Sequence, residues 1–292
     1  MTVRPLELNA RQAQRTSLAR APRSVLAAFP LAGLVAFVSL VGILSPSVYR
    51  QETANWCGQA IGQDWVDLFI GVPWLTATGV LAGRGSRRGL FLLTAGLLYT
   101  FYEFVIYGFE LHFNALFLPY CAVLGISCFA LLGIGVRYAR TDVGGWYSPA
   151  TPVRLANAVL AAVAVLFALT WLAEVVPALL NGATPASVIA AGTPTNPVYV
   201  IDLSVVLPAH LLAGVSLVRR RTLGYVLAPV LLGFDLLMSL SIAGMMLVMR
   251  QRGLEANPVV AAAMIVVAIV SAVALARLLR GLHAGNSPVL AQ

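Results

Sequence analysis

Residues 67–89, DLFIGVPWLTATGVLAGRGSRRG, and residues 202–224, DLSVVLPAHLLAGVSLVRRRTLG, share one pattern at a distance of 135 positions, from 67 to 202. The identical residues that meet at this shift include Asp67 with Asp202, Pro73 with Pro208, Gly79 with Gly214, Arg84 with Arg219 and Gly89 with Gly224. Apolar composition alone seldom aligns aspartate, proline and arginine. Each copy predicts a helix that starts with aspartate and bends at proline, followed by an arginine turn and a returning helix. The chain is therefore expected to be a duplicated helical body.

Composition places this body in a membrane. Hydrophobic residues make up 60% of the 292 residues and charged residues 10%, with a mean hydropathy of +0.87. A soluble domain cannot bury so much apolar surface, whereas about 20 apolar residues suffice for one helix to cross a bilayer. The predicted spans are residues 25–45, 65–83, 89–108, 115–136, 155–179, 198–218, 223–249 and 258–279. The first span is expected to be retained, because its apolar run exceeds the roughly 7–15 residues of a signal peptide and no small-x-small cleavage site follows it.

The fold class expected is an all-α integral membrane protein with eight transmembrane helices, arranged as two parallel four-helix repeats. Four is an even number of spans, so both repeats cross the membrane in the same sense and are related by an axis along the membrane normal. The predicted parts are a cytoplasmic N-terminal arm (1–24), repeat 1 (25–136), a cytoplasmic linker (137–154), repeat 2 (155–280) and a cytoplasmic tail (281–292).

The basic residues predict the orientation and exclude several functions. All nineteen are arginine. Without lysine the chain forms no retinal or pyridoxal Schiff base and binds no ATP through a P-loop. Sixteen of the arginines lie before the first span, in alternate loops or after the last span, and the other three are Arg50, Arg250 and Arg252. The positive-inside rule then predicts a multi-pass protein of the cell membrane with both termini in the cytoplasm. The net charge of +8 is explained by this topology and by attraction to anionic lipid, so no nucleic-acid partner is expected.

Acidic residues inside the spans are the first candidates for function. A charged side chain at the centre of a span costs about 2.5–3.5 kcal/mol on insertion scales. Asp67 and Asp202 fall near the outer ends of the second and sixth predicted spans, with Asp64 as a helix N-cap ahead of Asp67. The two aspartates are either a symmetric carboxylate pair at the mouth of a central cavity or scaffold residues favoured by the helix dipole.

Glu103 lies deeper, about 20 Å along the third span, with Tyr99 and Tyr107 one turn away on either side. Its counterpart at the 135-residue shift is Met238, so the repeat does not require an acid there. A protonatable acid between two phenols suits a proton or cation relay. The alternative is a glutamate that is protonated, or paired with Arg50, and only locks helices together.

Three further residues complete the set of candidates. His210 and Asp235 each lie about 18 Å into adjacent spans, near the midplane, where they form either a proton shuttle or one structural hydrogen bond. Glu174 lies near the outer end of the fifth span, close to Trp171. Trp171 and Tyr199 are expected at the outer membrane interface.

No metal and no cofactor are expected. A metal site built from Glu110, His112 and an aspartate at the cavity mouth is conceivable, but only three histidines occur in the chain, which argues against a zinc hydrolase. A disulfide between Cys57 and Cys121 is compatible with the oxidising side of the membrane, although unpaired cysteines are favoured.

The depth of the acids leads to the functional prediction. Asp67, Glu103, Glu174 and Asp202 are all predicted in the outer half of the membrane, whereas arginine turns fill the inner side. The expected protein is a transporter or permease-like protein, or a small-molecule-binding membrane protein, with a polar cavity in the outer half. Its partners would be the lipid bilayer and a small molecule or ion. The alternatives are an intramembrane enzyme acting on a lipid-linked substrate and a non-catalytic assembly partner. No HExxH or GxSxG motif occurs, so the sequence does not favour an enzyme.

Overall fold

A computed structural model describes residues 22–45 and 47–283. This part of the chain is helical and contains no β-strand. Eight helices are long and apolar enough to cross a membrane, as predicted: Arg23–Leu44, Ala54–Gly83, Arg87–Phe109 (α6), Phe117–Ala139 (α7), Arg154–Leu180 (α8), Pro197–Val218, Thr222–Gln251 (α12) and Pro258–Arg280 (α13). The first is divided into α2 (Arg23–Leu26) and α3 (Ala28–Leu44), and two short helices, η2 (Gly144–Trp146) and α9 (Ala186–Ala191), lie in loops.

Large apolar side chains cover much of the outer surface, and several polar side chains are buried inside. Large apolar side chains such as Phe129 (74% exposed) and Leu169 (63%) point outward, whereas Asp64 and Ser127 are fully buried. Soluble monomers rarely expose extended apolar surface, and a lipid environment removes its cost. The structure is therefore compatible with a multi-pass membrane protein.

Local sequence signals set several helix ends. Asn196 accepts hydrogen bonds from the backbone N–H groups of Val198 and Tyr199, and Pro197 occupies the first helical turn. Asn257 does the same for α13, where Pro258 is the first residue. Both asparagines thus satisfy free N–H groups at a helix N-terminus, and both predicted helix starts are confirmed within one residue.

The second span starts earlier than predicted. The stretch before residue 65 is helical from Ala54, and Thr53 is the N-cap, accepting a hydrogen bond from the Trp56 N–H. Asp64 is therefore not an N-cap but a buried residue inside the helix. The polar side chains of Gln63 and Asp64 lower the hydropathy of this stretch, but they face the protein interior, where neighbouring side chains satisfy them.

The two quoted segments share an unusual backbone feature. The second span consists of α4 (Ala54–Val66), the π-helical segment η1 (Asp67–Gly71) and α5 (Val72–Gly83). The sixth consists of α10 (Pro197–Ile201), the π-helical segment η3 (Asp202–Val206) and α11 (Leu207–Val218). Each π segment immediately precedes a helix with proline in its first turn. Proline donates no N–H and crowds the carbonyl of residue i−4, so a locally widened helix accommodates it.

The following turns also match. Gly85 and Arg220 occupy the left-handed region, with φ of 86° and 53°, and the hydrogen bond from Ser86 N to Leu81 O recurs from Arg221 N to Ser216 O. The recurrence predicted from the sequence therefore extends to helix boundaries, π segments and turns.

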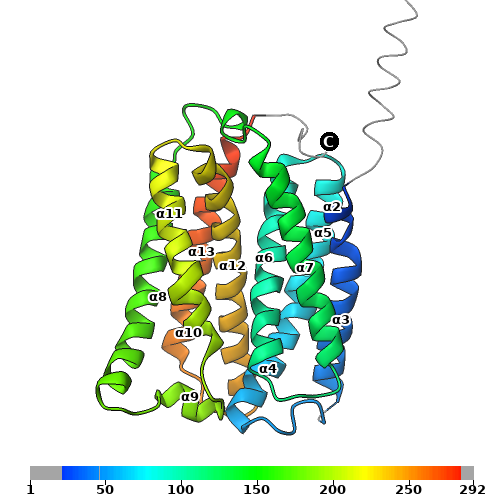
Figure 1. The fold of residues 1–292 in the computed structure, drawn as a ribbon, viewed down its shortest axis with the longest axis vertical. Coiled ribbons are helices and arrows are strands. Elements are labelled where there is room, and N and C mark those ends of the chain that lie inside the picture. Colours follow the sequence, from blue (N-terminus) through cyan, green and yellow to red (C-terminus); the bar gives the residue numbers. More distant parts are fainter. Residues whose placement is uncertain (1–21, 46, 284–292) are drawn as a thin grey trace, which may run out of the picture.

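The helices form two groups that meet along the centre of the molecule (Figure 1). One group contains α2 to α7 and the other α8 to α13, with α6 and α12 side by side between them. Helix α4 also packs against α12 across this boundary. The core position of α6 and α12 explains why they are the most buried of the eight helices.

Most arginines of the described residues lie at one end, which we call the arginine end, whereas Arg50, Arg250 and Arg252 lie at the other. Ser148 N donates to Gly281 O, Arg88 Nε donates to Leu279 O, and the guanidinium of Arg87 lies 5.1 Å from the centre of the Trp146 ring. We call the other end, which carries α9, the distal end (Figure 1). Most of the predicted arm and tail, with Arg4, Arg11, Arg15 and Arg20, lies outside the described residues.

Candidate functional site: a central cavity lined by acids and aromatic rings

A cavity of about 340 Å³ lies between the two helix groups. Its wall comes mainly from α4 and α6 on one side and from α8 to α12, including η3, on the other, with one residue from α13. It extends from Ser187 and Asn196 at the distal end to His210 and Asp235 in the interior. Small-molecule sites commonly have volumes of roughly 300–1,000 Å³ and largely apolar walls with a few polar groups.

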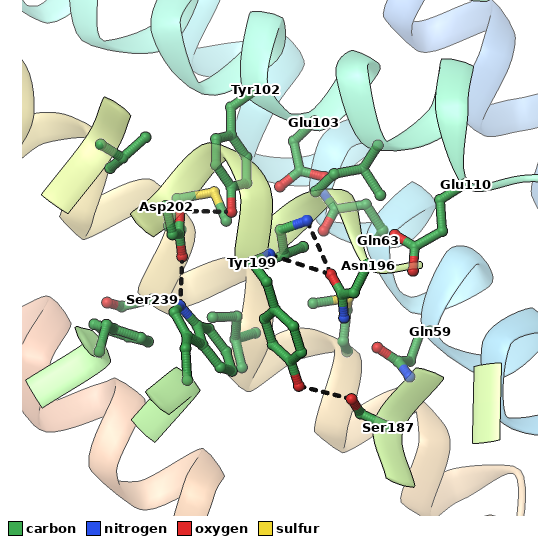
Figure 2. Close-up of a pocket in the computed structure, with 18 of the residues that line it drawn as sticks. Gln59, Gln63, Tyr102, Glu103, Glu110, Ser187, Asn196, Tyr199, Asp202 and Ser239 are labelled. Carbon is green, nitrogen blue, oxygen red and sulfur yellow. Dashed lines mark hydrogen bonds between the residues drawn. The ribbon is translucent and has the colours of Figure 1, made fainter. Parts of the chain in front are cut away.

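Asp202 is held in place by two neutral donors from different helices. Tyr102 Oη of α6 donates to Asp202 Oδ1 at 3.0 Å, and Trp171 Nε1 of α8 donates to Oδ2 at 2.8 Å (Figure 2). The carboxyl group is 7% exposed and borders the cavity. These bonds fix its orientation without supplying a positive charge.

Each of these donors belongs to an aromatic pair in the cavity wall. The Tyr102 ring meets the Phe234 ring edge-on at 5.4 Å, and the Trp171 ring lies 5.0 Å from the Tyr199 ring. Asp202 thus lies between two aromatic pairs, and all four rings line the cavity. Trp171 and Tyr199, which the sequence places near the outer interface, thus have rings that face this internal space.

Glu103 is a buried acid of the cavity wall without a hydrogen-bond partner in the described residues. Its side chain is 4% exposed, borders the cavity, and makes no hydrogen bond to another described residue. Figure 2 shows Tyr102 and Glu103 extending from α6 into the space that Asp202 and Gln63 also border. Arg50, the alternative partner considered from the sequence, is not a residue of this wall. Glu103 therefore presents a buried carboxyl group whose acceptors are not satisfied by the protein.

Two other acids at the cavity have an unsatisfied oxygen. Neither Glu110 Oε2 nor Asp235 Oδ2 has a hydrogen-bond partner in the described part of the chain. Burial, reinforced by the negative charge of Glu52, raises the pKa of Glu110 to about 8. Buried polar atoms without partners are few in native proteins, so unsatisfied carboxylate oxygens beside a cavity mark groups that a ligand could contact.

His210 and Asp235 form the predicted pair. His210 Nε2 lies 2.8 Å from Asp235 Oδ1, and Nδ1 lies 2.7 Å from the carbonyl oxygen of Val206. A carbonyl only accepts, so Nδ1 carries a hydrogen, and one further proton must lie between Nε2 and Asp235. The pair is then neutral overall. Because both ring nitrogens are engaged, His210 has no free lone pair with which to act as a base.

Glu174 links three helices at the distal side of the cavity. It accepts hydrogen bonds from Ser187 N at 2.7 Å and from Tyr199 Oη at 2.6 Å. It therefore connects α8 to α9 and α10. Helix α9 also reaches the first helix group, because Thr53 Oγ1 donates to Ala190 O at 2.9 Å. Helix α9 thus bridges both groups at the distal end of the cavity.

Asp67 lies behind the cavity wall. Its Oδ1 accepts hydrogen bonds from Gln63 Nε2 at 3.0 Å and Tyr99 Oη at 2.7 Å, and Ser241 Oγ of α12 donates to Gln63 Oε1. Of these residues only Gln63 borders the cavity. Of the two alternatives considered for the aspartate pair, the hydrogen bonds of Asp67 fit the scaffold role, whereas Asp202 borders the cavity. The helix begins at Ala54, so Asp67 lies well inside it.

A second buried cluster lies nearby. Asp64 accepts hydrogen bonds from Tyr49 Oη at 2.7 Å and Tyr107 Oη at 2.9 Å. Burial, with the negative charge of Asp64 close by, raises the pKa of Tyr49 well above its usual range. Tyr49 therefore remains a neutral donor, and this cluster ties the loop before α4 to α6.

The structure brings together most of the residues selected from the sequence. Glu103, Tyr107, Glu174, Asp202, His210 and Asp235 line the cavity, whereas Asp67 and Tyr99 do not. Sequence reasoning missed Tyr102 and Phe234 and assigned Trp171 and Tyr199 to the interface. The sequence did offer one signal for the aromatic wall. Trp171 and Glu174 are three residues apart, so they lie on the same face of one helix.

The remaining polar groups do not form a metal site. His112 Nδ1 lies 3.0 Å from Glu52 Oε2, an acid that was not among the partners considered from the sequence. Within the described ranges no three histidine, cysteine or acidic residues lie close enough to hold a metal ion. Cys57, Cys121 and Cys128 are unpaired.

Comparisons with protein-family models, with curated proteins and with solved structures find no match to this chain. The function must therefore be inferred from the cavity itself.

Proposed function

We propose that this protein is a membrane transporter or permease-like protein that binds a small molecule in the central cavity. The observation that carries the proposal is the unsatisfied carboxyl group of Glu103 in a cavity between two helix groups. A buried carboxyl group is costly unless water, a proton or a ligand compensates for it. The position of the site also fits transport. Movement of one helix group relative to the other would expose a binding site between them alternately to either side of the membrane.

The proposal includes an architecture and an orientation. The two helix groups are parallel four-helix repeats, related by an axis along the membrane normal, and the arginine end faces the cytoplasm. The recurrence of π segments at Asp67 and Asp202 and of the turns at Gly85 and Arg220 supports the repeat. The concentration of arginines supports the orientation. The cavity then lies toward the outer face of a cell membrane.

The engagement of both nitrogens of His210 argues against catalysis by this histidine. A histidine that acts as a general base needs a free lone pair, and His210 has none. Asp202 is likewise held by Tyr102 and Trp171 in a fixed position. Such groups recognise a ligand rather than exchange protons with it.

Uptake into proteoliposomes tests this function. Vesicles containing the wild-type protein would be incubated with an isotope-labelled cell extract, washed, and opened for mass spectrometry. We expect at least one solute to accumulate above the level in protein-free vesicles, and Glu103→Gln to abolish that accumulation. Glu255→Gln is the matched control, because Glu255 is exposed and lies outside the cavity.

The Glu103→Gln protein should insert and purify like the wild type, since no hydrogen bond is lost. The absence of any accumulated or bound solute, or equal uptake by wild type and Glu103→Gln, would contradict the proposal.

A further inference from the structure

We propose that the ligand of this cavity is a monovalent organic cation with an aromatic or other apolar body. This inference rests on the proposed function and specifies its substrate class. It is drawn from the charges, the rings and the unsatisfied acceptors that border the same space.

The first argument is the imbalance of charge. Five of the eleven acidic residues of the chain line the cavity: Glu103, Glu110, Glu174, Asp202 and Asp235. In the described part of the chain no arginine borders it, and His210 is its one basic side chain. The proton shared between His210 and Asp235 neutralises that pair alone. Burial favours the protonated form of Glu110. Glu103, Glu174 and Asp202 have no cationic partner in the wall, and a positively charged ligand would provide one.

The second argument is the aromatic wall. Phe167, Trp171 and Tyr199 form a continuous set of ring contacts on one side, and Tyr102 and Phe234 form a second set. Aromatic faces carry partial negative charge and attract quaternary or protonated amines, with tryptophan the strongest. Asp202 lies between the two sets, so charge and ring faces converge on the same region. An anion would meet repulsion there from both.

The third argument is the set of unsatisfied atoms. Glu103 has no hydrogen-bond partner among the described residues, and Glu110 Oε2 and Asp235 Oδ2 also lack one. All of these atoms accept hydrogen bonds or positive charge. One donor, Trp56 Nε1, is also unsatisfied at the wall, and it would match an acceptor oxygen on the ligand body.

The apolar part of the wall determines the body of the ligand. Met238, Met245 and Met246 of α12 complete the lining around the rings. Methionine is flexible and polarisable and adapts to ligands of different shape. The cavity volume of about 340 Å³ is larger than a bare inorganic cation requires, and it is sufficient for a small organic cation.

Binding of three probes that share a phenyl ring tests the inference. Benzyltrimethylammonium is positively charged, 2-phenylethanol is neutral and phenylacetate is negative. Affinity would be measured by calorimetry on the purified full-length protein. We expect the cation to bind at least about tenfold more tightly than the alcohol, and phenylacetate to bind most weakly.

Two variants locate the site. Asp202→Asn and Glu103→Gln should each weaken binding of the cation by about tenfold and change binding of the alcohol by less than about threefold. Glu255→Gln should leave all three affinities unchanged. If one variant fails to fold, the comparison of the three probes on the wild-type protein still decides the question.

The outcomes separate this inference from the proposed function. Tightest binding of phenylacetate, equal affinity for the cation and the alcohol, or cation binding that both variants retain would overturn the cation inference. Accumulation of a neutral or anionic solute from the cell extract that depends on Glu103 would overturn it too, and would leave the transporter proposal intact. If no probe binds and no solute accumulates, the proposed function itself is wrong.

Discussion

At the scale of single residues, two neighbouring tyrosines of α6 have different tasks. Tyr99 donates to Asp67 behind the cavity wall, and Tyr102 donates to Asp202 in the wall. The counterpart of Tyr99 at the 135-residue shift is Phe234, so phenylalanine fits the equivalent place in the second half. Removal of one hydroxyl group at a time therefore distinguishes an effect on stability from an effect on ligand binding.

Tyr99→Phe should lower the free energy of unfolding by about 1–3 kcal/mol, because Asp67 and Gln63 each lose a buried partner. Its effect on ligand affinity should stay below about threefold, because Tyr99 does not border the cavity. Tyr102→Phe, the matched control, should weaken binding by a larger factor. Thermal unfolding and calorimetry with the same probes measure both effects. Loss of binding in Tyr99→Phe alone would contradict this division.

Glu110 predicts a pH dependence of stability. Burial, with the charge of Glu52, raises the pKa of Glu110 from 4.5 to about 8, so the fold favours its protonated form. With respect to Glu110, the folded state is therefore most stable below about pH 4.5, where this side chain is protonated in both the folded and the unfolded state. This stabilisation is lost as the pH rises through 8. Glu110→Gln mimics the protonated form. Its unfolding midpoint should match the wild type near pH 5 and exceed it by several degrees at pH 9. The same difference at both pH values, or none at pH 9, would show that Glu110 is not buried in this way.

The burial of Glu103 illustrates what a single sequence reveals at this scale. Depth along a predicted span was enough to mark it as a costly acid. The position of Asp67 was misjudged, because the polar residues Gln63 and Asp64 made a buried helical turn resemble a loop. Hydropathy cannot distinguish polar residues that face water from polar residues that satisfy one another inside a bundle.

At the scale of helices, the sequence predicted the eight spans, and asparagine–proline pairs predicted two of their starts. It did not predict the π segments, although each follows from a proline one turn later in the chain. It also did not predict α9, whose six residues are too few for a periodic pattern. The place of α9 is set by contacts with Thr53 and Glu174, which lie far from it in the sequence.

The end of α9 depends on Gly192. Its φ of +76° is unfavourable for other residues, and an added Cβ would lie 2.9 Å from Thr53 Cγ2. Gly192→Ala should therefore cost about 1 kcal/mol in backbone strain and should also push α9 away from Thr53. We expect the cavity tryptophans, Trp56 and Trp171, to become more accessible, which quenching of fluorescence by acrylamide measures.

Gly182→Ala is the control for this prediction. Gly182 also has a positive φ, of +58°, but no atom lies within 4 Å of an added Cβ. It should show the loss of stability without the increase in quenching. Equal quenching in both variants would indicate that the contact of α9 with Thr53 does not close the distal end.

At the scale of the whole molecule, the cavity arises from the meeting of two helix groups. Tyr102 of α6 and Trp171 of α8 converge on Asp202 from opposite groups. No local pattern predicts such a meeting, because it depends on how α6 and α12 pack across the boundary. The recurring sequence pattern predicts similar local structure in the two segments that carry it; it does not predict which faces the helix groups present to each other. This is why Glu103 and Asp235 could be selected singly from the sequence, whereas their common cavity could not.

The proposed orientation determines which side of the membrane reaches the cavity first, and it can be tested by matched cysteine substitutions. Ala150 and Ala183 are both exposed, the first in the loop between α7 and α8 at the arginine end and the second in the loop between α8 and α9 at the distal end. Each would be changed to cysteine in a protein whose three native cysteines are replaced by alanine. Because arginine-rich loops remain in the cytoplasm, a membrane-impermeant maleimide should label Ala183→Cys in intact cells. Ala150→Cys should react only after the cells are permeabilised. Labelling in the reverse order would place the distal end, α9 and the acids behind it on the cytoplasmic side, and the cavity would then receive its ligand from within the cell.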